Sequence, residues 1–404
     1  MRVGHARASV ARFDGFGSLA WEAAHHPSYL GETVLVPFVS ALSGLMLTLT
    51  AAAPPTPAVE SAGHPVFNDP LGTHRQQYAL IRSVDSRIDH TPRGATIRLA
   101  AFSFAMPSTS RALLRAHRRG VVVKMVVDQR SARWGSVQRL RSVLGTDVSR
   151  RSFVRVCHES CRGTAGKQHA KFVTISRTEH TRRVVLVGSM NFTELAAAGQ
   201  WQDLYAVSDD EPLFASMRTL FRAMVRDTPQ PSLALTRAGP GFRLSTSPVD
   251  PSAVDPLVSR LRKVHCDAAT GTGRRGHTVL AVSMHAWNGP RGVDLARRVA
   301  ALSEDGCRVR VIAGVGFGRR VTSILERSAV RYLATGGTAG ATHEKLMVLS
   351  GHFGRDRAAS LVWTGSHNWT GRSLRNDEVT LRLQGPRHVA AYLANVRRIW
   401  RATR

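Results

Sequence analysis

The sequence predicts an α/β protein that consists of two similar halves. Short runs rich in β-branched residues alternate with amphipathic helical patterns, which is typical of sheets covered by helices. The same order of elements occurs twice, and two short polar motifs recur at the same place in each copy. We therefore expect two tandem α/β sandwich halves, residues 61–228 and 233–404, joined by a linker near residues 228–232.

The expected elements follow the same order in both halves: an amphipathic helix, a strand, a helix, a second strand, the polar motifs and a closing helix. Apart from the middle helix and the motifs, these patterns cover residues 78–88, 96–104, 121–127 and 213–225, and then 254–264, 278–284, 308–312 and 389–399. The offset is 174 between the histidines at 169 and 343, and 177 between the asparagines at 191 and 368. So steady an offset indicates a duplication.

The two motifs of each half place polar residues at the ends of apolar strands. The first half has Gln168-His169-Ala170-Lys171 and then Gly188-Ser189-Met190-Asn191, and the second has Thr342-His343-Glu344-Lys345 and then Gly365-Ser366-His367-Asn368. Period-two alternation puts the histidine and lysine of each motif on one face of a strand. With 17 histidines and five lysines among 404 residues, His-x-Lys is expected only about 0.2 times by chance. His285 and Ser103 occupy matching strand ends, for which a core or rim position is favoured and a place in the lining of the cleft is the alternative.

These motifs resemble the phospholipase D superfamily, whose signature is His-x-Lys-x4-Asp followed by Gly-Ser-x-Asn. The resemblance covers residues 65 to 404. It implies that the two copies meet across a pseudo-twofold axis and form one active site. One histidine would attack phosphorus and the other would protonate the leaving alcohol, while lysines and asparagines bind the non-bridging oxygens. It also implies that no metal or other cofactor is needed.

The chemistry of a phosphodiester agrees with this resemblance. Its transition state needs fixed cations and donors around the equatorial oxygens, which two lysines and two Asn/Ser pairs supply. The site residues we expect are His169, Lys171, Ser189, Asn191, Asp203, His343, Lys345, Ser366, Asn368 and Glu378.

Acidic partners are expected to fix the tautomers of the two histidines. Asp203 and Glu378 follow their asparagines by 12 and 10 residues and resemble the family's acids in this role, with Asp377 competing for the second. The motif aspartate is replaced by Ser176 and Ser350 in both copies, and the structural role of this aspartate in the family implies that catalysis does not require it. The resemblance to two-motif secreted lipid enzymes of actinobacterial type implies that His169 is the nucleophile and His343 the acid.

Several substrates are compatible with this site. We favour hydrolysis of the distal phosphodiester of phospholipids at a membrane surface, because two fused motifs and export fit such an enzyme. A secreted metal-independent nuclease is the alternative, and the net charge of +28 favours it because nucleic acids are anionic. Lipid synthases and a non-catalytic phosphate-binding protein are further hypotheses. The charge discriminates weakly, since only five of the 56 basic residues are lysines, which indicates a coding bias toward arginine.

The N-terminal region and the cysteines point to export. The uncharged apolar segment 34–53 within residues 1–60 reads as a signal peptide, with a membrane anchor facing outside or a buried helix as alternatives. We therefore expect a secreted monomer. Four cysteines in an exported chain predict two disulfides, Cys157–Cys161 and Cys266–Cys307.

Overall fold

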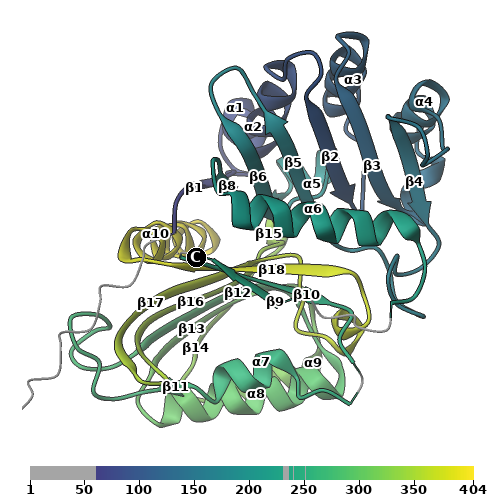
Figure 1. Cartoon of the computed structure of the whole chain (residues 1–404). Helices are drawn as coiled ribbons and strands as arrows, with labels where there is room; N and C mark the ends of the chain where they lie inside the picture. The colour runs from purple at the N-terminus through teal and green to yellow at the C-terminus, as the bar shows by residue number, and fades with distance from the viewer. Residues whose placement is uncertain (1–60, 231–235, 240, 251) are drawn as a thin grey trace, which may run out of the picture. The chain divides into compact units, whose positions relative to one another are not determined.

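The chain forms two mixed β-sheets flanked by helices, as the α/β prediction requires (Figure 1). The computed structural model describes residues 61–404 except residues 231–235, 240 and 251. The expected signal peptide lies outside these residues, so export stays a prediction. No helix within the described residues is long and apolar enough to cross a membrane.

The first sheet has seven strands in the order β1-β8-β6-β5-β2-β3-β4. Its strands are β1 (His64–Phe67), β2 (Thr96–Ala101), β3 (Val122–Asp128), β4 (Phe153–Cys157), β5 (Phe172–Arg177), β6 (Arg182–Gly188) and β8 (Asp203–Val207). The helices of this half are α1 (His74–Gln77), α2 (Ala79–Asp89), α3 (Pro107–Arg118), α4 (Gly135–Leu144), α5 (Glu194–Ala198) and α6 (Glu211–Arg226).

The second sheet repeats this arrangement and adds strands at its edge. Its order is β14-β13-β12-β16-β17-β18-β10-β9, with β11 beside β16. The strands are β9 (Thr236–Gly239), β10 (Phe242–Ser247), β11 (Val264–His265), β12 (Val279–Trp287), β13 (Arg308–Phe317), β14 (Arg331–Ala334), β16 (Lys345–Phe353), β17 (Asp356–Gly365) and β18 (Glu378–Gln384). The helices are α7 (Pro256–Leu261), α8 (Gly289–Glu304), α9 (Arg319–Glu326) and α10 (Pro386–Thr403).

The duplication is confirmed by strand order. The series β8-β6-β5-β2-β3-β4 in the first sheet has the same connectivity as β18-β17-β16-β12-β13-β14 in the second. A third, two-stranded sheet pairs β7 (Gln200–Trp201) with β15 (Ala341–Thr342) and so joins the halves. Because β7 precedes β8 and β15 precedes β16, this small sheet holds the two motif regions together.

Apolar side chains alternate between the two faces of each sheet, and they form three hydrophobic cores. One face of each sheet packs within its own half, whereas the opposite faces share a core that includes α6 and α10. The predicted apolar stripes of the two closing helices face this shared core, with Met217, Phe221, Val396 and Ile399 fully buried. The motif strands therefore end beside the junction of the halves.

One predicted helix is shorter than expected. The pattern 254–264 is helical only over α7, which begins after Asp255, whose side chain caps the helix by accepting from the Leu257 amide at 2.9 Å. Val254 lies outside this cap and is exposed, and Val264 belongs to β11. Both expected disulfides, Cys157–Cys161 and Cys266–Cys307, are present.

Candidate active site

The two His-x-Lys motifs are held together by backbone hydrogen bonds between the halves. The His169 amide donates to the carbonyl of Asp377 at 3.0 Å, and the His343 amide donates to the carbonyl of Trp201 at 2.8 Å. The two bonds are equivalent under the duplication. Each histidine therefore enters the site from one half while its backbone is fixed by the other, which brings the two predicted motif copies into one site.

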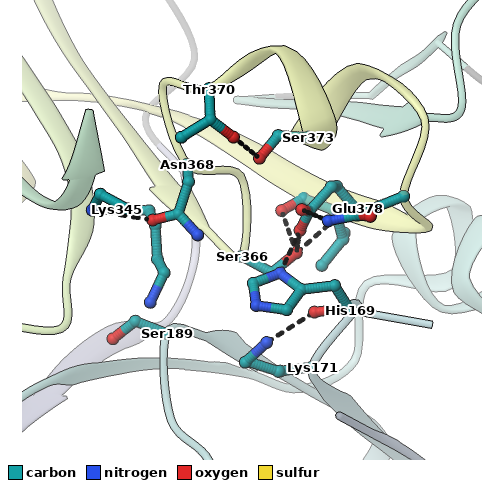
Figure 2. A network of polar contacts seen from close by, with 12 residues as sticks. His169, Lys171, Ser189, Lys345, Ser366, Asn368, Thr370, Ser373 and Glu378 are labelled. Atoms are coloured by element: carbon teal, nitrogen blue, oxygen red, sulfur yellow. Dashed lines mark hydrogen bonds and ion pairs between the residues drawn. The ribbon is translucent and has the colours of Figure 1, made fainter. Parts of the chain in front are cut away.

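His169 is oriented by Glu378 from the opposite half (Figure 2). Its Nδ1 atom lies 2.8 Å from Glu378 Oε2, and both side chains are buried. Burial would raise the pKa of Glu378, but the His169 charge and hydrogen bond outweigh it and hold this pKa at about 2. The anionic carboxylate thus fixes the proton on Nδ1 and leaves Nε2 with a free lone pair. This is the arrangement that a nucleophilic imidazole needs.

Glu378 is itself held by two further donors. The Ser366 hydroxyl donates to Oε2 at 2.6 Å, and the Asn376 amide donates to Oε1 at 3.1 Å. Both carboxylate oxygens therefore accept hydrogen bonds, which keeps the anion in place. Asp377, the competing candidate, instead forms a buried ion pair with Arg162 at 2.9 Å and accepts from Ser160 at 3.0 Å. Glu378 is thus the acid that faces His169.

His343 has an amide partner where an acid was expected. Its Nδ1 atom lies 3.1 Å from Gln202 Oε1 and 3.1 Å from the Ser189 carbonyl. The Gln202 Nε2 group donates to the Ala196 carbonyl at 2.6 Å, so the amide oxygen is the atom that faces the imidazole. Two neutral acceptors therefore orient His343 without adding negative charge.

The expectation that Asp203 orients a histidine is wrong. Its carboxylate Oδ2 accepts from the Thr364 hydroxyl and, at 3.1 Å, from the Tyr392 hydroxyl. The two halves differ here in the register of the strand that follows each motif serine. Ser189 pairs with the backbone of Asp203, whereas Ser366 pairs with Val379, so Gln202 and not Asp203 is the counterpart of Glu378.

The motif glycines confirm this register. A Cβ atom at Gly188 would lie 2.2 Å from the Asp203 carbonyl oxygen, and one at Gly365 would lie 2.1 Å from the Val379 carbonyl oxygen. Because neighbouring residues of a strand point to opposite faces, the one-residue difference turns Asp203 away from the site. Sequence spacing missed Gln202 because an amide carries no charge signal and the loop before it is one residue longer.

The two motif lysines are buried together in the substrate-free site, which disfavours their charged forms. Burial lowers the pKa of Lys171 to about 7, although the nearby carboxylates of Glu378 and Asp128 act in the opposite direction. Burial and then the Lys171 charge lower the pKa of Lys345 well below its usual value. Each ammonium donates to the carbonyl of its motif histidine, and Lys345 Nζ also lies 2.9 Å from His343 Nδ1. A bound anion would offset this charge and favour the protonated lysines.

Both histidines are neutral in the substrate-free site. Burial is the main cause that lowers the pKa of His169 to about 4, with the lysine charges adding to it. The pKa of His343 lies well below 6.5 for the same reason, with Lys345 as its largest charged neighbour. Because the charges of one half act on the histidine of the other, the four side chains form a single electrostatic unit.

The motif residue Asn368 is placed to donate, whereas the motif serines are not. Asn368 Oδ1 accepts from the Ala286 amide at 3.1 Å, and its Nδ2 group has no acceptor among the described residues (Figure 2). Asn191 Oδ1 is buried without a partner within the same residues. Ser189 and Ser366 accept at 3.0 Å from the backbone amides of Asp203 and Val379. The two serines stabilise the motif turns and do not donate hydrogen bonds to a substrate, whereas we expected them to bind the equatorial phosphoryl oxygens.

The serines that replace the motif aspartates lie far from the histidines. Ser176 Oγ accepts from the Thr96 amide at 2.9 Å, and Ser350 Oγ accepts from the Gly273 amide at 3.0 Å. Each is five residues beyond its motif lysine, which is roughly 16 Å along a strand. Both replacements therefore lie away from the groups that surround the histidines.

A third histidine, His285, packs on His343. Their ring centroids are 4.3 Å apart, and the equivalent neighbour of His169 is Phe102, at 4.7 Å. His285 stands at a register shift in β12, a position where bulges often redirect side chains. Burial and then the Lys345 charge lower its pKa to about 3, so it is a neutral polar neighbour.

Comparison with known families identifies the chain. The profile of the family described as "Cardiolipin synthase, PLD-like domain" matches residues 86–225 and 277–400, which together contain both motif pairs. The chain belongs to this phospholipase D-like family. It is a phospholipase D superfamily enzyme that acts on phosphodiesters. A comparison with curated protein sequences gives no significant match.

Several solved structures are similar to this phospholipase D-like chain at low sequence identity. Phosphatidylserine synthase from Haemophilus influenzae is 13% identical, with a TM-score of 0.55 over 85% of this chain and 87% of that one. Polyphosphate kinase from Porphyromonas gingivalis is 16% identical, with a TM-score of 0.54 over 84% of this chain, which spans only 50% of the kinase. Yeast tyrosyl-DNA phosphodiesterase is 12% identical, with a TM-score of 0.46 over 80% of this chain and 90% of that one.

Proposed function

We propose that this protein hydrolyses the distal phosphodiester of phospholipids through a phosphohistidine at His169. The observation that carries the mechanism is the His169–Glu378 contact between the halves, which leaves Nε2 free beside two buried lysines. The choice of a lipid is supported by the family description and by phosphatidylserine synthase, which shares the two-half fold over most of its length. Both are named for phospholipids.

The first step forms a covalent intermediate. His169 Nε2 attacks phosphorus, and the bond from phosphorus to the head-group oxygen breaks. His343 donates a proton to the leaving oxygen, so that a free alcohol departs. The phosphate anion offsets the charge of Lys171 and Lys345, which raises the pKa of His343 above its value in the empty site and permits protonation. The lysines and the Asn368 amide stabilise the equatorial oxygens.

The second step hydrolyses the phosphohistidine and regenerates the free enzyme. Neutral His343 removes a proton from water, and the resulting hydroxide attacks phosphorus. The phosphorus–nitrogen bond breaks, His169 regains its lone pair, and phosphatidic acid departs. Transfer to an alcohol instead of water would give a phosphatidyltransferase, which uses the same groups. We propose that the enzyme works as an exported monomer at a membrane surface.

A nucleic-acid substrate is the second candidate. The observation that favours it is the net charge of +28, which would attract a phosphate backbone. The same catalytic groups would then act on a nucleic-acid phosphodiester. The two candidates differ in substrate and not in mechanism, so a single set of assays separates them.

The test is a side-by-side assay of the purified protein on phosphatidylcholine vesicles and on single- and double-stranded DNA, each with and without EDTA. We expect choline and phosphatidic acid from the vesicles, unchanged by EDTA, and no product from the His169→Ala variant. Cleavage of DNA but not of lipid would overturn the lipid substrate. Loss of activity with EDTA, restored by a divalent ion, would instead overturn the metal-independent mechanism.

A further inference from the structure

A cavity lined by six arginines lies in the second half, away from the motif residues. Its volume is about 640 Å³, and it is formed by the starts of β12 and β13, by β14, by the loop before β12 and by α10. The arginines are Arg274, Arg275, Arg308, Arg310, Arg331 and Arg397, which we call the arginine pocket. No aspartate or glutamate lines it among the described residues.

The positive charge of the arginine pocket is not balanced by the protein. Arg310 and Arg331 are directly opposed on neighbouring strands, a placement of like charges that destabilises a sheet. Burial, followed by the charges of Arg331 and Arg397, lowers the pKa of Arg310. The Nε atom of Arg310 is buried with no hydrogen-bond partner in the described part of the chain. An anion in this cavity would reduce the repulsion between the arginines, favour the charged form of Arg310 and accept a hydrogen bond from its Nε atom.

An aromatic ring fixes the guanidinium groups. Trp400 on α10 is contacted by Arg310 at 4.9 Å, by Arg404 at 5.7 Å and by Arg331 at 5.8 Å from the ring centroid. Such stacking orders side chains that would otherwise be mobile. Trp400 thus orders two of the six pocket arginines, Arg310 and Arg331, before any ligand binds.

The arginine content of the chain does not by itself explain this cluster. Some arginines elsewhere in the described residues are paired with acids, as in Arg115–Asp89 at 2.7 Å and Arg291–Asp255 at 2.6 Å, whereas no acid among those residues lines this cavity. An excess of arginine spread by coding bias would leave single charges on the surface. It would not be expected to place six of them around one cavity without an acid.

The arginine pocket is distinct from the catalytic site. Arg310 pairs with Ala281 on β12, whereas Lys345 pairs with Met284 three residues further along the same strand. Ala281 and Met284 point to opposite faces of the sheet, since side chains alternate along a strand. The pocket therefore opens on the face covered by α10, and no motif residue lines it.

We propose that the arginine pocket binds a compact anion with several adjacent phosphate groups, such as a free oligophosphate. Guanidinium groups bind phosphate oxygens in a bidentate way, and several of them around one ring match closely spaced charges. A nucleic-acid strand fits less well, because its phosphates are separated by sugars and bases. A flat membrane surface could not enter a concave site. This proposal does not depend on the substrate of the catalytic site.

The test is calorimetric titration of the full-length protein with inorganic tripolyphosphate at physiological salt. The pocket variant is Arg331→Gln with Arg397→Gln, both exposed in the structure. The matched control is Arg118→Gln with Arg141→Gln, two exposed arginines of the first half that carry the same total charge change. We expect the pocket variant to bind about tenfold more weakly or worse, and the control to change by less than about twofold.

Equal losses in the pocket variant and the control would show diffuse attraction to a cationic protein and would overturn the proposal. Unchanged binding in the pocket variant would overturn it as well. A single-stranded oligonucleotide that loses affinity in the pocket variant while tripolyphosphate does not would replace the oligophosphate by nucleic acid. If the pocket variant melts early, Arg274→Gln with Arg308→Gln provides a second exposed pair for the same comparison.

Discussion

Gln202 and Glu378 hold equivalent places in the two halves, yet one is an amide and the other a carboxylate. Each side chain contacts Nδ1 of the motif histidine of the opposite half: Gln202 Oε1 lies 3.1 Å from His343 Nδ1, and Glu378 Oε2 lies 2.8 Å from His169 Nδ1. The carboxylate makes its histidine the better nucleophile, since it favours the developing positive charge. The amide leaves its histidine less basic and a better proton donor. The pseudo-twofold site is therefore chemically asymmetric.

The first prediction compares Glu378→Gln with Asp203→Asn. Glu378 accepts three hydrogen bonds, so a glutamine would turn an NH2 group toward at least one donor and disturb the His169 tautomer. We expect kcat to fall roughly 10²–10⁴-fold. An asparagine at position 203 can still accept from Thr364 and Tyr392, so we expect a loss under about tenfold. Steady-state kinetics on a soluble phosphodiester measure both, and equal losses in two folded variants would contradict the assignment.

The second prediction concerns the pH profile of Gln202→Glu. Burial and Lys345 hold the pKa of His343 well below 6.5, and a carboxylate at position 202 would favour the imidazolium and raise that pKa. If His343 is the acid, the protonated form survives to higher pH. The alkaline limb of kcat/KM should therefore move up by about one pH unit or more. Movement of the acid limb alone would indicate that His343 acts first as a base.

The third prediction concerns a buried carboxyl between the motif residues His343 and Lys345. Burial, followed by the charge of Asp203, raises the pKa of Glu344 to about 8. The unfolded chain releases this proton near pH 4.5 while the folded protein keeps it, so this group makes the protein less stable as pH rises from about 4.5 to 8. Glu344→Gln should remove that loss. Urea unfolding at pH 5.5 and 7.5 should show a larger stabilisation by the variant at the higher pH, and an equal difference at both would contradict the shift.

The fourth prediction ranks the disulfides. Cys266–Cys307 closes a segment with a sequence separation of 41, and Cys157–Cys161 one of 4. Loop entropy gives a stabilisation of about 4 kcal/mol for the longer loop and about 2 kcal/mol for the shorter one. Denaturant unfolding of the two paired Cys→Ser variants tests this order. A reversed order would mean that the short loop acts through the Cys161–Asp377 contact and not through chain entropy.

Most of the fold could be predicted from the sequence because the same pattern of strands, helices and motifs occurs in both halves. The repeated strands, the closing helices and the two motif pairs each have a local signal that survives in both copies. The helix expected over 254–264 is too long because its cap at Asp255 is a single hydrogen bond that apolar spacing does not reveal. The joining of the halves through β7 and β15 rests on long-range pairing that has no local pattern.

The motif residues of the site and Glu378 were predicted from the sequence, whereas Gln202 was missed. His169, Lys171, His343, Lys345, Asn368 and Glu378 surround the site as expected, and Asp203 does not. An acid 10 to 12 residues after the motif asparagine is the right residue in one half and the wrong one in the other, because the first half carries the amide Gln202 at the equivalent position. His285 and Gln202 have no motif of their own, and only the strand register brings them to His343.

The central claim is that His169 alone forms the covalent intermediate. The measurement is acid-free rapid quench of a labelled phosphodiester with a good leaving group, followed by peptide mapping of the wild type, His169→Ala and His343→Ala. A good leaving group removes the need for the acid, which contributes roughly 10²–10⁴-fold, but nothing replaces the nucleophile. We predict label on His169 in the wild type and in His343→Ala, and none in His169→Ala. Label on His343, with His169→Ala still forming the intermediate, would contradict the account.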